Sequence, residues 1–271
     1  MKKIDLHIHT LSTLNDADFE FDIDKLSEYI NTMRIDCIAV TNHNTFDKEQ
    51  FLQIKDKLTD SVVMPGIEVD LCGGHILLIT EYESIDSFVI QANAVHSKIV
   101  SPNSSLDYDT FRGIFPDLSR FLVIPHYGKE PKIPFDIIKK FGDDIFAGEV
   151  TSPKKFIYAI KDLNALTPVV FSDCRLTSST MVFSSQQTFV DIGDITLNSL
   201  KSALHDKNKV SLNEDGGHDL ISIQNGEIKL STGLNIILGR RSSGKTHTLQ
   251  MIKGEYKGGN IKYIKQFITV R

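Results

Sequence analysis

The sequence predicts an α/β fold over residues 1–212, in which a mostly parallel sheet or closed barrel is surrounded by helices. Two observations support this prediction. Short runs rich in β-branched residues alternate with amphipathic stretches, which is the pattern of repeated βα units. Histidines and carboxylates recur at the ends of the apolar runs, and the carboxyl ends of barrel strands converge on one mouth.

The expected strands are short apolar runs. Asp36–Thr41, with the sequence DCIAVT, is typical of a buried strand. Cys72-Gly73-Gly74 joins two such runs and indicates a hairpin, which interrupts the βα rhythm. The full set comprises residues 2–10, 36–41, 62–64, 66–71, 75–80, 121–125, 145–151, 168–172 and 188–192.

The expected helices carry apolar residues at helical spacing. Leu26, Ile30 and Met33, for example, recur every three or four residues and would form one face of a helix. The full set comprises residues 23–33, 47–58, 84–99, 107–115, 134–141, 153–163 and 197–204.

Composition narrows the class of protein. The formal net charge of the 271 residues is -5 and the pI is about 6.0, which argues against nucleic-acid binding through bulk charge but permits a local basic groove. No apolar run approaches the roughly 18 to 20 residues of a membrane span, and the start lacks the apolar core of a signal peptide. Cys37, Cys72 and Cys174 are widely spaced and indicate reduced thiols. We therefore expect a cytoplasmic protein that does not associate with a membrane.

The first strand carries the first candidate metal ligands. His7 and His9 point to the same face, because side chains alternate along a strand, and two imidazoles so placed can bind one ion. Asp5 lies on that face too and is expected to accept a hydrogen bond from a ligating ring.

Further ligands fall at the ends of other strands. Each one alone is compatible with a simple loop cap, but their accumulation at one predicted mouth indicates a metal centre. Imidazoles mixed with carboxylates favour zinc, manganese or iron. The set exceeds what a single ion needs, so two or more ions are expected, and paired ions suit phosphoester hydrolysis. The additional ligands are His43, Glu68, His75, His126 and Asp173.

These motifs resemble, in order, those of the PHP (polymerase and histidinol phosphatase) superfamily. The resemblance covers about residues 1–212 and implies a distorted seven-stranded (β/α) barrel with a two- or three-metal phosphoesterase centre. It implies one ion held by His7, His9, Glu68 and Asp173, with Glu68 bridging to a second ion on His75 and His126. His43 and an acidic residue would face a third position. The motifs are Asp5–Thr10, Thr41–Thr45, Gly66–Val69, His75–Leu78, Pro125-His126 and Ser172-Asp173.

The chain departs from the family pattern near that third position. Arg175 stands where the family commonly has a histidine, and a guanidinium cannot ligate a metal. We therefore expect two full metal positions and a weak or empty third, with Arg175 binding substrate phosphate. Asn42 stands where the family usually has Asp, which weakens the carboxylate support of the neighbouring ligands. For the acidic residue that would face the third position, in the loop after the first strand, we prefer Asp16 to Asp18.

The alternating strand and helix pattern ends near residues 210–218, where we place a domain boundary. Short strands are expected at 220–223, 228–230 and 234–238, and a helix at 247–252. Between these last two lies a G-x-x-x-x-G-K-[ST] motif, which binds nucleotide phosphates through a helix N-terminus. The segment 213–271 resembles the opening of an SMC-like or ABC-like P-loop ATPase, without a Walker B strand after it. The nucleotide-binding residues are Gly239, Ser243, Gly244, Lys245 and Thr246.

Together these features predict a metal-dependent phosphoesterase, either a nuclease or a phosphatase, with Glu68, His43 and Arg175 as catalytic residues. His43 or His126 would shuttle a proton. The resemblance to PHP barrels fused to such ATPases implies a setting in defence against foreign DNA or phage. ATP and Mg²⁺ would need the rest of an ATPase domain, from a longer chain, a partner or a homo-oligomer. The alternative is a non-catalytic scaffold or sensor that regulates an ATPase.

Overall fold

The computed structural model describes residues 1–214, 221–223, 228–230 and 235–255. It divides the chain into two compact units, Met1–Gly217 and His218–Arg271, each described separately below. Among the helices of the described residues, none is both long enough and apolar enough to span a bilayer.

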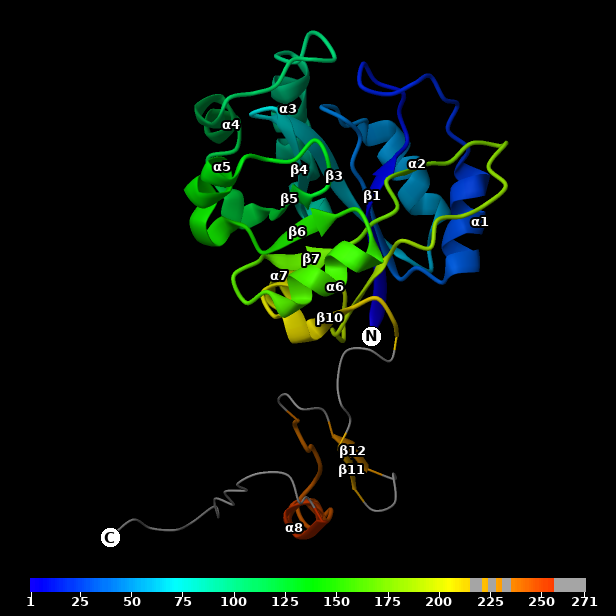
Figure 1. Cartoon of the computed structure of the whole chain (residues 1–271). Coiled ribbons are helices and arrows are strands. Elements are labelled where there is room, and N and C mark those ends of the chain that lie inside the picture. The colour runs from blue at the N-terminus through cyan, green and yellow to red at the C-terminus, as the bar shows by residue number, and fades with distance from the viewer. Residues whose placement is uncertain (215–220, 224–227, 231–234, 256–271) are drawn as a thin grey trace. The chain divides into compact units, whose positions relative to one another are not determined.

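The first unit is a mixed α/β structure built on one ten-stranded sheet (Figure 1). The order across the sheet is β10-β9-β1-β2-β3-β4-β5-β6-β7, and the short β8 also pairs with β1. The strands are β1 (Lys2–His9), β2 (Cys37–Val40), β3 (Val62–Leu71), β4 (Gly74–Ile79), β5 (Leu122–Gly128), β6 (Ala147–Val150), β7 (Thr167–Val169), β8 (Cys174–Arg175), β9 (Thr188–Val190) and β10 (Val210–Ser211).

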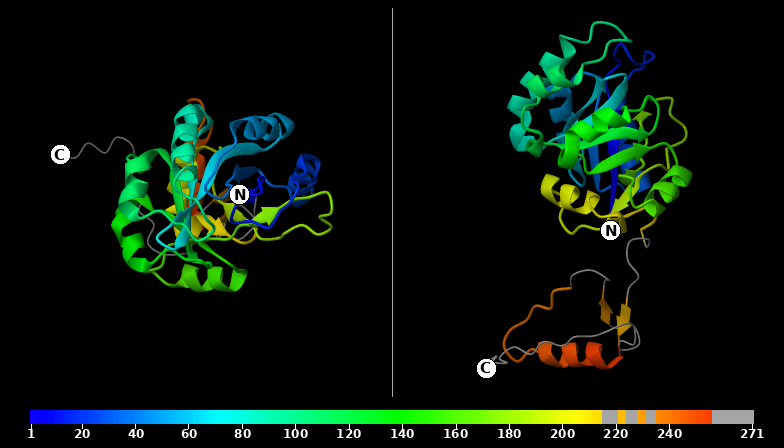
Figure 2. Two further views of the ribbon diagram at one scale, coloured as in Figure 1. Left: turned by 90° about the horizontal axis from the view of Figure 1, so that it is seen from above. Right: turned by 60° about the vertical axis from the view of Figure 1, so that its left-hand side comes forward.

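The helices of this unit lie on the outer side of the curved sheet (Figure 2). Asp22, Asp47 and Asp107 cap α1, α2 and α4, because each side chain accepts a hydrogen bond from a backbone N–H of the first turn. The helices are α1 (Ile23–Met33), α2 (Lys48–Lys57), α3 (Ile85–His96), α4 (Tyr108–Ile114), α5 (Phe135–Phe141), α6 (Pro153–Lys161) and α7 (Leu197–Leu204).

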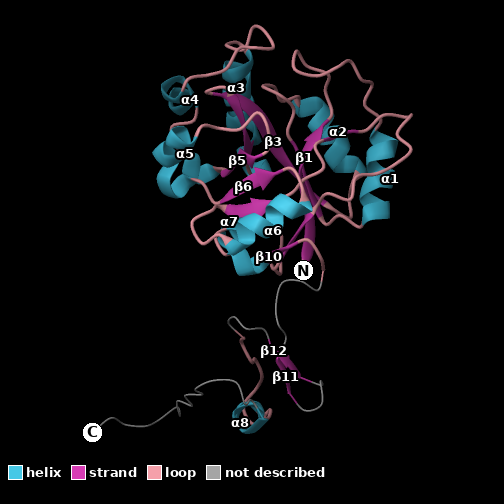
Figure 3. Cartoon of the chain, viewed as in Figure 1, coloured by secondary structure: helices cyan, strands magenta, loops and turns pink. Residues whose placement is uncertain are grey.

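The sheet, whose strands are magenta in Figure 3, mixes parallel and antiparallel pairs. The pairs β1–β2, β1–β8, β2–β3, β5–β6 and β6–β7 are parallel, whereas β3–β4, β4–β5, β1–β9 and β9–β10 are antiparallel. Side chains nearly close the barrel: Thr188 Oγ1 accepts from Val170 N at 2.8 Å, and Asp5 Oδ1 accepts from Ser172 N at 3.0 Å. The sheet is therefore a nearly closed barrel with a hairpin inserted, as the sequence predicted.

Some boundaries differ from the sequence-based expectation. Residues 62–64 and 66–71 form one strand, β3, because Pro65 lies where the strand changes partner from β2 to β4. Gly66 is needed there, since a Cβ at this position would lie 2.8 Å from Thr41 Cγ2. Residues 170–172 do not continue β7, and β8 and β10 are additional short strands.

The second unit contains a two-stranded antiparallel pair and a helix. β11 (Ile221–Ile223) pairs with β12 (Ile228–Leu230), and α8 spans Lys245–Glu255. The strand expected at 234–238 is wrong for residues 235–238, which are irregular, and no described strand lies alongside to pair with them. Leu220 and Leu234, also expected in strands, lie outside the described residues.

Candidate metal centre

The face of β1 that carries His7 and His9 forms one wall of a buried polar cluster. Both side chains are fully buried, and their Nε2 atoms lie 3.0 Å apart. Asp5 does not support either ring, contrary to the sequence-based expectation. Its carboxylate instead accepts from Tyr29 Oη at 2.6 Å and from Ser172 N, so it fastens α1 and the segment before β8 to β1.

Glu68 lies at the middle of the cluster, and its two oxygens face different histidines. Oε2 lies 3.0 Å from His7 Nε2 and 3.2 Å from His9 Nε2. Oε1 lies 2.8 Å from His75 Nδ1 and 3.2 Å from His126 Nε2. One carboxylate is thus shared between two pairs of imidazoles.

Backbone pairing brings the segment after β2 to Glu68. Asn44 N donates to Glu68 O at 2.7 Å, and Glu68 N donates to Asn42 O at 3.0 Å, forming an isolated parallel bridge. His43 Nδ1 consequently lies 3.1 Å from Glu68 Oε2. The Asn42 side chain anchors the loop after β1, because its Oδ1 accepts hydrogen bonds from Thr10 N and Leu11 N.

Strand register explains the other neighbours. Asp70 lies opposite His75 across the β3–β4 hairpin, and His75 Nε2 is 3.1 Å from Asp70 Oδ1. His126 on β5 lies opposite Glu149 on β6, with His126 Nε2 3.3 Å from Glu149 Oε2. A single-residue slip would turn these side chains away from the cluster.

Glu149 is a candidate site residue that the sequence did not indicate. Its Oε2 lies 2.9 Å from His7 Nδ1, so it is placed to fix the tautomer of His7, as expected of Asp5. An acidic residue inside the apolar run Ile145–Val150 was the available signal. Asp70, within the apolar run of β3, was missed in the same way.

Lys129, which directly follows β5, is buried within the cluster. Only 9% of the residue is exposed. Its Nζ donates to Glu149 Oε1 at 2.8 Å and lies 2.9 Å from Asp173 Oδ2. Glu149 and Asp173 together retain the charge of the ammonium: burial lowers its pKa, but these carboxylates outweigh burial and the pKa is raised.

Asp173 and Arg175 close the cluster opposite β3. Asp173 Oδ1 lies 3.0 Å from His9 Nε2, and Arg175 NH1 donates to the same oxygen at 2.9 Å. Arg175 Nε donates to Asp16 Oδ1 at 2.5 Å, and Arg175 NH2 lies 3.4 Å from His43 Nε2. Asp16, rather than the exposed Asp18, is therefore the loop acid at this cluster.

The clustered charges shift several pKa values. Burial alone would raise the pKa of Glu68, but the charge of His7 and the close approach of the His126, His7 and His75 imidazoles hold it well below its usual range. Burial would lower the pKa of His7, yet the charges of Glu149 and Glu68 raise it to about 10. Burial lowers the pKa of His43 to about 3. A neutral His43 suits ligation better than the proton shuttle expected of it.

The donor set fits divalent metal ions. In the described part of the chain, His126 Nε2, His43 Nδ1 and Asp70 Oδ1 are buried without a hydrogen-bond partner of acceptable geometry, and such groups call for an explanation such as a bound ion. Imidazole and carboxylate donors suit zinc, manganese or iron. Five sets of three ligand atoms lie within 4.8 Å of one another: His7–His126–Glu149, His7–His9–Glu68, His9–Asp16–His43, His43–Asp70–His75 and Glu68–His75–His126.

Comparison with known proteins finds likeness of structure rather than of sequence. No family model matches the chain, and no curated protein matches it. The crystal structure of PsfC from Pseudomonas syringae is similar in fold, with a TM-score of 0.50 and 15% identity over 80% of this chain and 93% of that chain. That likeness shows the fold alone.

A second solved structure, from Bifidobacterium adolescentis and described as "a putative metal-dependent phosphoesterase", has a TM-score of 0.45 and 9% identity. It covers 74% of this chain and 95% of that chain.

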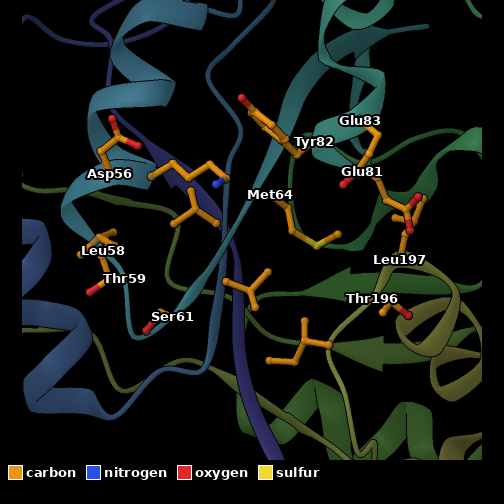
Figure 4. A pocket seen from close by; sticks show the side chains of 14 residues that line it. Asp56, Leu58, Thr59, Ser61, Met64, Glu81, Tyr82, Glu83, Thr196 and Leu197 are labelled. Atoms are coloured by element: carbon orange, nitrogen blue, oxygen red, sulfur yellow. The ribbon is translucent and has the colours of Figure 1, made fainter.

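Two cavities flank the cluster. One, of about 520 Å³, contains His43, Asn44, the loop 11–15 and the last turn of α3 with His96. The other, of about 250 Å³, contains Asp70, His75 and the loop 102–105. A larger cavity of about 790 Å³ lies at the opposite end of β3, lined by Met64, Tyr82 and Leu197 (Figure 4). It contains none of the candidate ligands, so the chemistry belongs to the smaller cavities.

The predicted nucleotide-binding residues lie in the second unit. Lys245 begins α8, and its Nζ donates to Gly239 O and Arg240 O, both at 2.7 Å. Gly244 has a φ of 90°, a conformation that glycine adopts readily. Ser243 N donates to Arg240 O at 3.2 Å, which tightens the loop before the helix.

Proposed function

We propose that this chain is a metal-dependent phosphoester hydrolase with a two-ion centre. The observation that carries the proposal is the placement of Glu68, whose Oε2 faces His7 and His9 while its Oε1 faces His75 and His126. A carboxylate shared in this way suits a bridge between two ions, and paired ions suit displacement at phosphorus.

The residues of the cluster would divide between two ions and the side chains that support their ligands. His7, His9, Glu68 and Asp173 would hold one ion, and Glu68, His75 and His126 the other. When bound, the ions would supply an acidified water and positive charge for the phosphate oxygens. Glu149 accepts from His7 Nδ1 and so directs the Nε2 lone pair towards the centre. Lys129 holds the Asp173 carboxylate in place.

Arg175 would help to bind the phosphate. Two of its nitrogens are committed to Asp16 and Asp173, whereas NH2 contacts only His43 Nε2 among the described residues. The NH2 hydrogens can therefore donate to a phosphate oxygen and stabilise the charge that develops there.

Activity with a bound metal tests this function. Full-length protein loaded with Mn²⁺ or Zn²⁺ should hydrolyse a generic phosphoester, and Glu68→Gln should lower kcat/KM at least about a hundredfold because both ions lose a ligand. Glu28→Gln, which changes an exposed glutamate on α1, is the matched control. Hydrolysis that is unaffected by Glu68→Gln would contradict the proposal, and undetectable hydrolysis by the loaded protein would favour the non-catalytic scaffold.

For the second unit we propose phosphate binding by the loop 239–246 at the start of α8. Its supports are the sequence motif and the position of Lys245 at the first turn of the helix. ATP hydrolysis would need further elements of an ATPase, and a role beside such a module in defence against foreign DNA stays a proposal based on the sequence resemblance.

A further inference from the structure

We propose that the centre is built for small phosphodiesters, which carry one negative charge and two organic substituents, rather than for phosphomonoesters. Arg175 sets this preference by placing a single positive charge where another divalent ion would otherwise bind. The inference rests on the proposed hydrolase function and names its substrate class. It is carried by the position of the guanidinium and by the two flanking cavities.

The guanidinium occupies one of the five sets of candidate ligands. Asp16 and His43 belong to the set completed by His9, and both are contacted by Arg175, through Nε at 2.5 Å and NH2 at 3.4 Å. An arginine donates only and keeps its charge at every relevant pH. It therefore satisfies these acceptors as a cation and excludes an ion from them.

Lys129 places a positive charge beside a second set. Its Nζ lies 2.8 Å from Glu149 Oε1 and 3.1 Å from His7 Nδ1, two members of the set completed by His126. The remaining three sets all include Glu68 or His75, and neither cation forms a hydrogen bond or ion pair with these two side chains. The two ions of the proposed function would be held at these sets, while Arg175 and Lys129 place single charges at the other two.

A count of charges follows from this arrangement. Lys129, Arg175 and two divalent ions bring six positive charges, and the imidazoles are neutral when they ligate. Five carboxylates oppose them, which leaves one positive charge to attract substrate. A phosphodiester neutralises it, whereas a phosphomonoester near neutral pH carries up to about two negative charges. The carboxylates are Asp16, Glu68, Asp70, Glu149 and Asp173.

The cavities supply an independent argument. His43 belongs to the cavity of about 520 Å³ and His75 to that of about 250 Å³, and their ring centroids lie 5.0 Å apart. A phosphate bound at the proposed ions beside these rings would therefore have one cavity for each of its two substituents. Among the described residues neither lining includes a Lys or Arg, so the substituents are uncharged or cationic and short, unlike the backbone of a nucleic acid.

The test compares substrates and counts metals in the full chain loaded with Mn²⁺. We expect two Mn²⁺ per chain by mass spectrometry, and kcat/KM at least about tenfold higher for bis(4-nitrophenyl) phosphate than for 4-nitrophenyl phosphate, since one charge at close range is worth at least a factor of several. Arg175→His should bind a third ion and lose most of that preference. Arg175→Lys, which keeps one charge, should retain two ions and the preference.

Arg120→His is the matched control, because Arg120 bonds Ser84 and Ser87 rather than the centre. Hydrolysis that favours the monoester, a third ion in the unchanged protein, or no additional ion in Arg175→His would overturn the inference while leaving the hydrolase intact. Loss of the proposed function has a different signature, namely two bound ions with hydrolysis of neither ester.

Discussion

At the scale of single residues, the main feature of the centre is that one carboxylate, Glu68, contacts several imidazoles. Glu68 is 1% exposed and contacts four histidines within 3.2 Å through its two oxygens, with His43 as a fifth. Without a bound metal ion the carboxylates favour protonated imidazoles, and the pKa values of His7 and His126 are both raised. The metal-free and metal-loaded forms must therefore differ in their protons.

The raised pKa of His7 predicts how the stability of the metal-free chain depends on pH. Because the folded pKa of about 10 exceeds the unfolded value of 6.5, its contribution is fully present below pH 6.5 and is lost as the pH rises towards 10. His126 shifts in the same direction. Urea unfolding with a chelator present should give a lower free energy of unfolding at pH 9.5 than at pH 6.5, by a few kcal/mol at about 1.4 kcal/mol for each pKa unit.

The control for this measurement is His7→Gln, which removes the titrating group and should flatten the dependence. A stability that stays level between pH 6.5 and 9.5 in the unchanged protein would mean that His7 is neutral in the folded, metal-free chain. The prediction would then be wrong.

At the scale of elements, the antiparallel hairpin β3–β4 does what a βα unit could not. It places Asp70 and His75 directly opposite each other. It also brings His75 back to Glu68, only seven residues earlier in the chain. The first residue of β4 must be Gly74 for the hairpin to fit against its neighbours. A Cβ there would collide with the backbone carbonyl of Lys132, and would lie 2.5 Å from Ile133 N.

Gly74→Ala should therefore lower the free energy of unfolding by about 1–3 kcal/mol, since the hairpin must move away from the loop before α5. Because His75 is the next residue, the affinity for one of the two ions should fall while the other is retained, which a titration with Mn²⁺ can measure. Gly113→Ala is the matched control: nothing lies within 4 Å of its Cβ, and in α4 alanine should stabilise by about 0.5–1 kcal/mol. Equal effects of the two substitutions would contradict this account.

The same elements show what the sequence could and could not predict. Alternation along β1 placed His7 and His9 on one face, and Gly73 with Gly74 predicted the hairpin. The sequence could not predict that Glu149 rather than Asp5 supports His7, since this depends on the register between β5 and β6, which lie far from β1 in the chain. Nor could it show that Lys129, in a polar loop segment, folds back between two carboxylates.

At the scale of the molecule, the two units differ in how their apolar residues are used. Both apolar core clusters draw their described members from residues 4–212. In α8 none of the described residues is buried, and Ile236 and Leu238 before it are 71% and 86% exposed. The barrel unit thus has the packing needed to fold alone, whereas exposed apolar residues in the second unit suit association with further protein.

A chain ending at residue 214 should therefore keep the barrel and its metal centre. We expect it to unfold in one cooperative transition and to bind the same number of Mn²⁺ ions as the full chain, because every candidate ligand and both core clusters lie before that point. It should not bind a fluorescent ATP analogue. Full-length Lys245→Ala should likewise bind the same number of Mn²⁺ ions and fail to bind the ATP analogue, since Lys245 is the charge expected to contact the phosphates. A truncated chain with fewer bound ions would show instead that the second unit helps to build the centre.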